Sequence, residues 1–394
     1  MRGSIVKRQG KATKDGKPIT LYYIVYQVGQ RQKWEAVPER TRKAAEKLLA
    51  KRLNEIGDGE YVEPSRQTFG EFKDVWVEKY AQAQVRPSTL ARYLSTFKTH
   101  ILPALGDKPL ADIGVEDVQG FKAAKLAEDL SPLTVKLFLR VIRQMLSHAV
   151  DWGYLRHNPA QKVKDPKIPR QEMDCLTPEE VRALLDGVQN DDMLRKWYPL
   201  FLTAVTTGLR INELLAMKWA NLDWNRGQYF VRETLTRKTE LQERKFAQTK
   251  TESSAQPVDV TPACLDALRE HKARQDKEKF KAGKKYQDQD LIFASSKGTP
   301  LDDMSLVKQV FHPALSAAGL RHIRFHDLRH TCASLLIHQG ESVKYVQRQL
   351  RHASAQITLD RYSHLFPEAS REAVKRLDAT LFSAPSKAGT GRAI

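Results

Sequence analysis

The chain has only three cysteines in 394 residues, and Cys175, Cys264 and Cys332 lie far apart in the sequence. Their spacing matches neither a disulfide framework nor a zinc site, which indicates a reducing compartment. No run of residues is long and apolar enough to span a bilayer, and the N-terminus lacks the apolar segment of a secretory signal. The sequence therefore argues against disulfide-stabilised secreted domains and membrane proteins, and it predicts a soluble intracellular protein.

Acidic residues are scarce relative to basic ones. The chain has 65 Lys and Arg residues against 47 Asp and Glu residues, which gives a net charge of +18 and an isoelectric point near 9.7. An excess of this size indicates a polyanionic partner, most often nucleic acid, although a basic surface can also serve solubility. A chain of 394 residues is too long for one ordinary core, so two or three domains are expected.

Residues 1–62 are predicted to form a small module of β-sheet and helix. Residues 20–28 and 32–37 are rich in β-branched and aromatic side chains and indicate two strands, with Gly29 in the turn between them. Thr41 is a suitable N-cap for the helix that follows. Basic residues gather in this module, and three of them are candidate DNA contacts: Lys7, Arg8 and Lys11.

Residues 68–165 are predicted to form an all-helical domain. Aromatic residues recur at helical spacing from Phe69 to Tyr80 and indicate a core. A longer helix begins near Ser131, and its expected buried stripe is Leu133, Leu137, Val141, Met145 and Ala149. Residues 158–170, with three prolines and several basic residues, indicate an exposed linker. Three basic residues of the domain are further candidate contacts to the DNA backbone: Arg86, Arg92 and Lys98.

Residues 175–383 are predicted to form a third domain, followed by a flexible tail at 384–394. Its first helix should start after Thr177, because Pro178 suits the first helical position and Glu180 completes a capping box. A strand pair at about 228–235 and 256–260 is expected between helices.

Four polar clusters in the third domain contain the residue types that phosphodiester chemistry needs. They lie at Arg210 and Glu213, at Lys250, at His326 and Arg329, and at His352 and Tyr362. An imidazole, a guanidinium and a phenol can manage protons, hold a phosphodiester and attack its phosphorus. Each cluster alone is a weak signal. Their joint order within one domain predicts an enzyme that cuts and rejoins DNA.

With these clusters the chain resembles the tyrosine recombinase, or phage integrase, family. The resemblance rests on TGLRINELL (207–215), HDLRHTCASLL (326–336) and LRHASAQITLDRYSH (350–364). It implies a multidomain fold: a small β-sheet plus helix module similar to arm-site-binding domains, an all-α domain similar to core-site-binding domains, and a mainly α catalytic domain with a small antiparallel sheet.

The resemblance implies a role for each matching residue. Tyr362 is expected to attack the scissile phosphate and to form a 3′-phosphotyrosyl link. Arg210 and Arg329 are expected to clamp the non-bridging oxygens, and His352 to donate a further hydrogen bond. His326 is expected to help remove the tyrosine proton, and Lys250 to protonate the 5′-oxygen. Glu213 is expected to brace the site.

No cofactor is expected. The arginines and the lysine would replace the cations that many phosphoryl-transfer sites use, so no metal is required. The bond energy would be kept in the phosphotyrosine, and the sequence has no Gly-rich loop ending in Lys-Ser or Lys-Thr for nucleotide phosphates.

The sequence departs from the family pattern before its second motif histidine, where glycine is usual and Arg351 stands here. A positive φ at this position would cost arginine about 1 kcal/mol. We expect instead that the turn differs slightly or that Arg351 adds a DNA contact. Two other choices stay open: Lys238 and Lys245 are alternative acids to Lys250, and Tyr345 is a rival phenol to Tyr362.

A site-specific recombinase acting as an integrase is the expected function. The alternatives are a type IB topoisomerase and a catalytically silent DNA-binding regulator. The expected partner is double-stranded DNA, at core and arm sites, with a homotetramer formed through exchange of a C-terminal helix at 368–377. An accessory DNA-bending or directionality factor is left open. The expected location is the cytoplasm of a bacterial host, close to the nucleoid, without a membrane partner.

Overall fold

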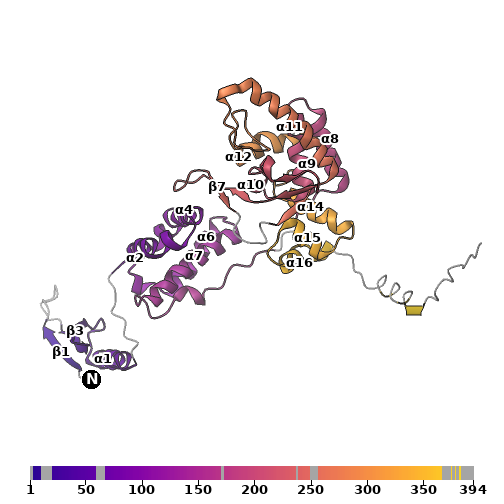
Figure 1. Ribbon diagram of the computed structural model, residues 1–394. Coiled ribbons are helices and arrows are strands. Elements are labelled where there is room, and N and C mark those ends of the chain that lie inside the picture. Colours follow the sequence, from indigo (N-terminus) through magenta and orange to yellow (C-terminus); the bar gives the residue numbers. More distant parts are fainter. Residues whose placement is uncertain are drawn as a thin grey trace, which may run out of the picture. The chain divides into compact units, whose positions relative to one another are not determined.

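The structure is a computed structural model that describes residues 3–9, 20–58, 67–169, 173–236, 238–248 and 256–365, with Val374, Asp378, Leu381 and Phe382. The chain divides into two compact units, Met1–Pro169 and Arg170–Ile394 (Figure 1). Within the described ranges, no helix combines the length and the apolar character needed to cross a bilayer. The expected tail at 384–394 lies outside the described residues, as does most of the segment 368–377.

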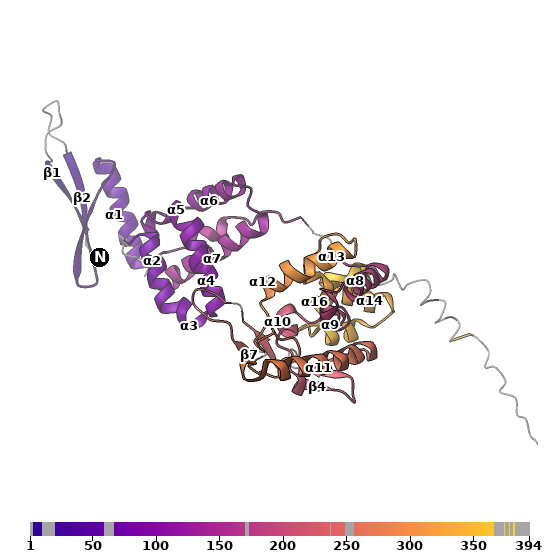
Figure 2. The same cartoon turned by 90° about the horizontal axis from the view of Figure 1, so that it is seen from above.

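The first unit begins with a three-stranded antiparallel sheet in the order β1-β2-β3, and α1 packs along it (Figure 2). The bounds are β1 (Gly3–Gln9), β2 (Thr20–Val28), β3 (Arg31–Ala36) and α1 (Arg42–Gly57). The two predicted strands and the Thr41 cap are present, and the Thr41 side chain accepts a hydrogen bond from Ala44 N. The strand β1 was not predicted, because Ile5 and Val6 are its only strong β-formers.

The rest of the first unit is a helical bundle (Figure 1). Two of its long helices each contain a single π-helical turn, and the other helices are regular. The bounds are α2 (Phe69–Trp76), α3 (Gln82–Gln84), α4 (Pro87–Thr96), α5 (Leu102–Leu105), α6 (Val115–Ala127) and α7 (Pro132–Asp151). The predicted aromatic core is confirmed, since Phe69, Phe72 and Trp76 are completely buried.

The predicted stripe of α7 is wrong at its N-terminal end. Val141, Met145 and Ala149 are buried as expected, but Leu133 and Leu137 are exposed. Positions four residues apart rotate about 40° around a helix at each step. The stripe faces the core at Met145. Followed back towards the start of the helix, it has therefore turned towards solvent at its first two leucines.

The predicted linker is wrong over its first half. Ala160 and Val163 are buried in the core of the helical bundle, within a short 3₁₀ turn and just after it. Asn158 donates to Arg143 O at 2.8 Å and caps Ala160 N. Arg143 in turn donates to the carbonyls of Ala160 and Val163. The prolines here lie in a segment that packs on α7.

The second unit is mainly helical. Its larger hydrophobic core joins α8, α9, α11 and the helices from α12 to α13, and a smaller cluster lies among α14, α15 and α16. The bounds are α8 (Pro178–Asn190), α9 (Tyr198–Thr207), α10 (Ile211–Leu214), α11 (Pro262–Ala282), α12 (Asp303–Leu306), α13 (His312–Ala317), α14 (Asp327–His338), α15 (Val343–Leu350) and α16 (Ala355–Tyr362). The predicted capping box of Thr177 and Glu180 is present.

The strands of this unit form two small antiparallel sheets, where one strand pair was predicted. Their bounds are β4 (Leu222–Asp223), β5 (Gln228–Phe230), β6 (Glu233–Leu235), β7 (Phe246–Gln248) and β8 (Pro257–Asp259). The first sheet has the order β4-β5-β8, and β6 pairs with β7. The predicted strand over 228–235 is therefore two strands. Phe230 faces Pro257, which has no N–H to continue the ladder beyond it.

Candidate active site

Arg329 connects three segments of the second unit. It lies in the first turn of α14, is almost completely buried, and donates from Nη1 to Gly208 O at 2.6 Å and from Nη2 to Leu350 O. Gly208 and Leu350 each stand two residues before another predicted site residue, Arg210 and His352. The two bonds use two of the five N–H groups and fix the plane of the guanidinium. Burial lowers the pKa of Arg329 to about 9, which leaves it charged at neutral pH.

The close approach of these segments depends on Gly208. It ends α9 with a φ of +65°, a conformation that costs other residues free energy. A Cβ at this position would lie 2.7 Å from Leu350 Cδ2 and 3.3 Å from Cys332 Sγ. Both the backbone conformation and the contact with α14 and α15 therefore require glycine.

Arg210 is oriented by Glu213, the residue that the family resemblance proposes as a supporting carboxylate. Arg210 Nη1 donates to Glu213 Oε1 at 3.0 Å, and the Arg210 backbone N–H donates to Oε2 at 3.0 Å. Glu213 is buried, whereas the Arg210 side chain is 42 % exposed. Burial acts to raise the pKa of Glu213, but Arg351 and Arg210 outweigh it and hold this pKa below the usual value. A charged, buried carboxylate thus holds an arginine that reaches solvent.

Arg351 does not have the role expected for it. Its backbone adopts the left-handed conformation, with φ 53° and ψ 47°, so the turn is the same one that glycine would make. Its side chain has no solvent exposure and forms an ion pair with Glu213. The prediction of an altered turn or a DNA contact is therefore wrong. The backbone cost of about 1 kcal/mol is offset by a buried ion pair that a glycine at this position could not form.

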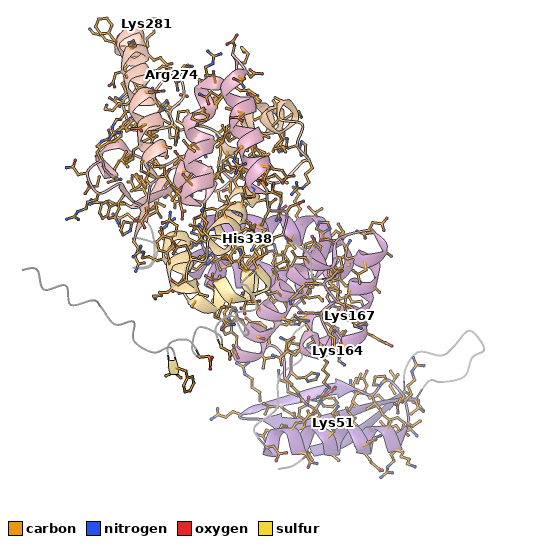
Figure 3. The ribbon with its side chains drawn as sticks, turned by 90° about the vertical axis from the view of Figure 1, so that its right-hand side faces the viewer. Lys51, Lys164, Lys167, Arg274, Lys281 and His338 are labelled. Atoms are coloured by element: carbon orange, nitrogen blue, oxygen red, sulfur yellow. The ribbon has the colours of Figure 1, made fainter. Side chains whose placement is uncertain are left out.

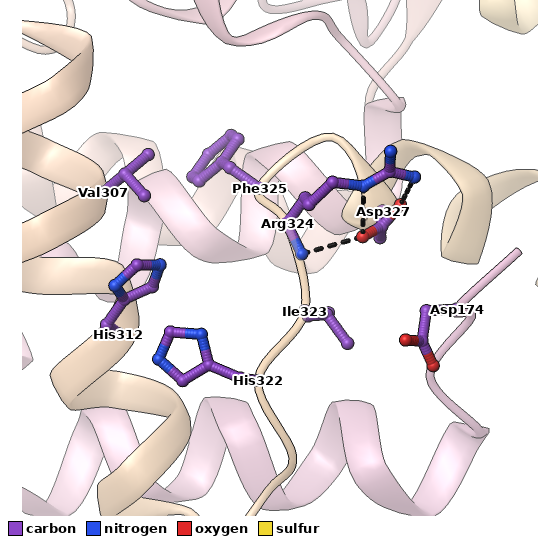
Figure 4. Close-up of a pocket in the computed structure, with 8 residues that line it drawn as sticks. All are labelled: Asp174, Val307, His312, His322, Ile323, Arg324, Phe325 and Asp327. Carbon is purple, nitrogen blue, oxygen red and sulfur yellow. Dashed lines mark hydrogen bonds and ion pairs between the residues drawn. The ribbon is translucent and has the colours of Figure 1, made fainter. Parts of the chain in front are cut away.

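His326 begins α14 at the edge of the site. The Asp327 carboxylate that follows it accepts from Arg324 N at 2.7 Å and from the Arg324 guanidinium (Figure 4). These bonds fix the N-terminal turn of the helix beside a pocket of about 440 Å³, in which the rings of His312 and His322 lie 4.0 Å apart between centroids and are tilted by 57°. Burial, Arg329 and Arg210 lower the pKa of His326, so its imidazole is neutral at neutral pH.

His352 follows Arg351 in the turn between α15 and α16. Its Nδ1 lies 2.9 Å from the hydroxyl oxygen of Thr358, and both residues are buried. Its ring stacks on that of Tyr362, with centroids 6.5 Å apart and an interplanar angle of 15°. Burial first, then Arg329 and Arg210, lower the pKa of His352 to about 3. The neutral ring therefore has one N–H to donate.

Tyr362 ends α16 inside the smaller hydrophobic cluster and has no solvent exposure. Its hydroxyl lies 2.6 Å from Nδ1 of His330, one turn of α14 after His326. Burial raises the pKa of Tyr362 above its usual value, although Arg329 and Arg361 oppose this. Sequence reasoning assigned no role to His330. The signal available was its i,i+4 spacing from His326, but its partner is 32 residues away in the chain.

The structure thus brings together Arg210, Glu213, His326, Arg329, His352 and Tyr362. Lys250 lies outside the described residues. Of the alternative acids, Lys238 pairs with Glu243 at 3.1 Å on an exposed loop, and Lys245 precedes β7. The rival phenol, Tyr345, donates to Asp259 Oδ2 at 3.2 Å instead of joining the cluster.

The candidate DNA contacts in the first unit are exposed where the structure describes them. Arg8 on β1 lies over the ring of Trp34, with Cζ 5.0 Å from the centroid. The other exposed positions are Lys7, Arg86, Arg92 and Lys98, and Lys11 lies outside the described residues. Among the described residues, no group of three or more His, Cys, Asp or Glu side chains is arranged to hold a metal ion.

Two family models match the chain over these same regions. The model of the phage integrase family matches residues 174–369, and that of the phage integrase N-terminal SAM-like domain matches residues 68–126. The chain belongs to the phage integrase family. Members of this family, the tyrosine recombinases, cleave and rejoin DNA, and the fold and enzyme class expected from the sequence are confirmed.

Two relatives agree with this membership of the phage integrase family. The chain is 27% identical over 386 residues to a "Tyrosine recombinase XerC-like" protein of Caldanaerobacter subterraneus subsp. tengcongensis, covering 93% of this chain and 97% of that one. It is 25% identical to the ICEBs1 integrase of Bacillus subtilis, over 86% and 91% of the two chains.

Two solved integrases share the fold. A Tn1549 transposon integrase in complex with a circular intermediate DNA has a TM-score of 0.66 at 18% identity, over 80% of this chain and 99% of that one. A lambda integrase tetramer bound to a Holliday junction has a TM-score of 0.56 at 21% identity, over 89% and 93%.

Proposed function

We propose that this member of the phage integrase family is a site-specific recombinase that integrates or excises a phage or other mobile element. The proposal depends on one observation. Two arginines, two histidines and a tyrosine lie close together at or near helix ends: Arg210, Arg329, His326, His352 and Tyr362. Attack by Tyr362 Oη on the scissile phosphorus forms a 3′-phosphotyrosyl link, breaks the P–O5′ bond and leaves a 5′-hydroxyl.

The arginines stabilise charge on the phosphorane. Arg210 and Arg329 donate to the non-bridging oxygens, whose negative charge increases in the transition state. The proposal is supported by their different surroundings: Arg210 is partly exposed and reaches outwards, whereas Arg329 is buried and rigid. Glu213 holds Arg210 in place and does not contact the phosphate.

The histidines and Lys250 manage hydrogen bonds and protons. When Thr358 donates to His352 Nδ1, the ring proton lies on Nε2 and is available to a phosphate oxygen. His326 assists in removing the tyrosine proton. Lys250 protonates the departing 5′-oxygen, and Lys238 and Lys245 stay as alternatives. No step of this scheme calls for a metal ion or a nucleotide.

The proposed partner is double-stranded DNA, bound at core sites by residues 68–165 and at arm sites by residues 1–62, with catalysis in residues 175–383. The relatives support this, because a Tn1549 integrase is solved with DNA and a lambda integrase as a tetramer on a Holliday junction. We propose a homotetramer joined by exchange of the segment 368–377. Recombination by this tetramer takes place in the bacterial cytoplasm, and a DNA-bending or directionality factor can assist it.

Covalent capture tests the proposed function. Wild-type protein and Tyr362→Phe are incubated in EDTA with sheared DNA that contains the gene and its flanks, and the reaction is stopped with SDS. Sequencing of protein-linked fragments should show adducts from wild type alone, at one short inverted repeat. Adducts scattered evenly would indicate a topoisomerase. Tight binding without any adduct would contradict the assignment of a cleaving enzyme on these substrates.

A further inference from the structure

The nucleophile of the proposed reaction has a partner that the family comparison did not supply. Tyr362 Oη lies 2.6 Å from His330 Nδ1, within the range of a strong hydrogen bond, and the side chains are on different helices, α16 and α14. Tyr362 is completely buried and His330 is 5 % exposed. A contact of this kind between two buried polar groups is fixed by the surrounding packing.

His330 is also the imidazole nearest to the tyrosine oxygen. His326, expected to assist with the tyrosine proton, touches His330 edge to face with ring centroids 5.0 Å apart. His352 stacks on the Tyr362 ring and directs its Nδ1 to Thr358. In the described part of the chain, the only hydrogen bond to the Tyr362 hydroxyl is the one to His330.

Burial, His326 and the neighbouring arginines favour a neutral imidazole at His330, and Asp327 opposes them. Burial is the first cause that lowers its pKa, to about 4, and the second is His326. A neutral imidazole with Nδ1 directed at a phenol can accept its proton, and the negative charge of a bound phosphodiester raises the basicity that burial lowers in the free protein. The titratable and charged groups that face it come from α14, from the loop before it, from the α15–α16 turn and from α16: His326, Asp327, Arg324, His352, Arg361 and Tyr362.

The position of His330 in the chain suits this role. It directly follows Arg329, so the acceptor of the proton and a proposed ligand of the phosphate are carried by the same turn of α14. The ring of Tyr362 has no exposure, so DNA reaches its oxygen only after the elements around α16 shift. The proton acceptor is already at hydrogen-bonding distance before that movement.

We propose that His330 is the direct proton acceptor for Tyr362 during cleavage. This inference rests on the proposed function. The Tyr362 Oη–P bond forms, the P–O5′ bond breaks, and the phenolic proton moves to His330 Nδ1. When the 5′-hydroxyl attacks the phosphotyrosine in the rejoining step, His330 returns the proton to the departing tyrosine oxygen. His326 is one imidazole further from the nucleophile and acts through His330.

The test isolates the nucleophile side of the reaction. The substrate is a DNA duplex with sulfur in place of the bridging 5′-oxygen. Its cleaved 5′ end leaves as a thiolate, which needs no acid, because thiols are far stronger acids than alcohols. With this substrate the contribution of Lys250 is bypassed. The variant His330→Asn retains an oxygen or nitrogen near the position of Nδ1 but cannot accept a proton at neutral pH.

The matched control is His338→Asn. His338 ends the same helix, is exposed, and is seen in Figure 3. Tyr362→Phe is the second control, because it reports on the nucleophile itself. Circular dichroism and DNA binding of each variant show that it is folded, and His330→Gln replaces His330→Asn if the latter is not.

Cleavage by His330→Asn should be about 100-fold slower than wild type at neutral pH. Without the acceptor, attack needs a phenolate formed by the solvent, so the rate of the variant should rise about tenfold per pH unit from about pH 6 to about pH 9, more steeply than wild type. His338→Asn should cleave like wild type.

Two results would overturn the role of His330. One is wild-type cleavage by His330→Asn, and the other is a loss by the same factor at every pH, as a structural role would give. Adducts from Tyr362→Phe would instead refute the assignment of Tyr362 as the nucleophile, and the absence of adducts from wild type would contradict the proposed function.

Discussion

Each unit of the molecule contains a buried aromatic side chain bonded to Nδ1 of a histidine on a neighbouring helix. In the helical bundle, Trp76 Nε1 donates to His148 Nδ1 at 2.7 Å. In the second unit, Tyr362 Oη lies 2.6 Å from His330 Nδ1. Both aromatic rings are completely buried, so neither the distance nor the burial of the ring distinguishes the two pairs, although His148 is partly exposed and His330 is buried.

The surroundings distinguish them. The rings of Tyr80 and Trp152 pack against His148, and an indole N–H can donate a hydrogen bond but has no nucleophilic oxygen. His330 and Tyr362 lie instead within the field of Arg329 and Arg361, and a phenol can lose its proton. The same local geometry therefore stabilises the fold in one unit and supports chemistry in the other.

The largest expected effect comes from removing the polar atom of each aromatic residue. Tyr362→Phe should lose the covalent adduct completely while DNA binding stays unchanged, because the ring is retained and only the nucleophilic oxygen is lost. Trp76→Phe should lower the free energy of unfolding by about 2 kcal/mol, since His148 loses its partner, and should still cleave. Adduct yield per folded molecule and urea denaturation measure the two effects. Loss of cleavage in Trp76→Phe would remove the contrast between the pairs.

A second pair of residues sharpens the comparison. Arg143 and Arg329 each donate to two backbone carbonyls, but only Arg329 belongs to the site. Lysine cannot make both bonds with a fixed fork. Arg329→Lys should slow cleavage about 100-fold, whereas Arg143→Lys should cost about 1 kcal/mol of stability with an unchanged rate. Single-turnover cleavage at saturating protein tests this, and equal rates for the two variants would contradict it.

Arg351 gives an intermediate effect with a particular order of variants. Loss of its ion pair with Glu213 should cost about 3 kcal/mol, of which glycine recovers about 1 kcal/mol through the left-handed backbone. Arg351→Gly should therefore be about 2 kcal/mol less stable than wild type, and Arg351→Ala less stable still. Chemical denaturation gives both values. An alanine variant as stable as the glycine variant would show that the positive φ carries no cost.

The smallest expected effect is a change in how steeply the stability of the protein depends on pH. Burial lowers the pKa of His330 to about 4, below the ordinary value of 6.5, so the unfolded chain binds more protons than the folded one between these values. Stability contributed by the neutral histidine is thus present above pH 6.5 and is lost as the pH falls towards 4. His330→Asn should show a shallower fall in denaturation midpoint over this range. An identical slope in both proteins would mean that His330 does not contribute.

Local signals in the sequence were sufficient for much of the fold. Thr41 and Thr177 cap helices as predicted, because a cap depends on residues within one turn. The buried aromatics of α2 follow from periodicity alone. Errors occurred where burial depends on the partner element. Leu133 and Leu137 fit a helical stripe but are exposed, and Ala160 is buried because α7 lies against it.

The candidate site divides in the same way. Arg210, His326, Arg329, His352 and Tyr362 were predicted from motif order, which a linear sequence displays, and they stay predictions. The pairs Tyr362–His330 and Arg351–Glu213 join residues 32 and 138 positions apart, and only the folded chain brings them together. At Arg351 the sequence showed the departure from glycine, but it could not show that the buried carboxylate of Glu213 lies beside it.

The complete burial of Tyr362 has a consequence for protein chemistry. A reagent that nitrates or iodinates phenols reacts with accessible rings, so in the free protein it should modify Tyr345, which is partly exposed, before Tyr362. Once DNA brings a phosphate to the Tyr362 oxygen, the elements that cover the ring must have shifted, while the hydrogen bond to His330 is kept. The rate at which Tyr362 becomes labelled, measured by mass spectrometry over time, would then report the rate at which α16 opens.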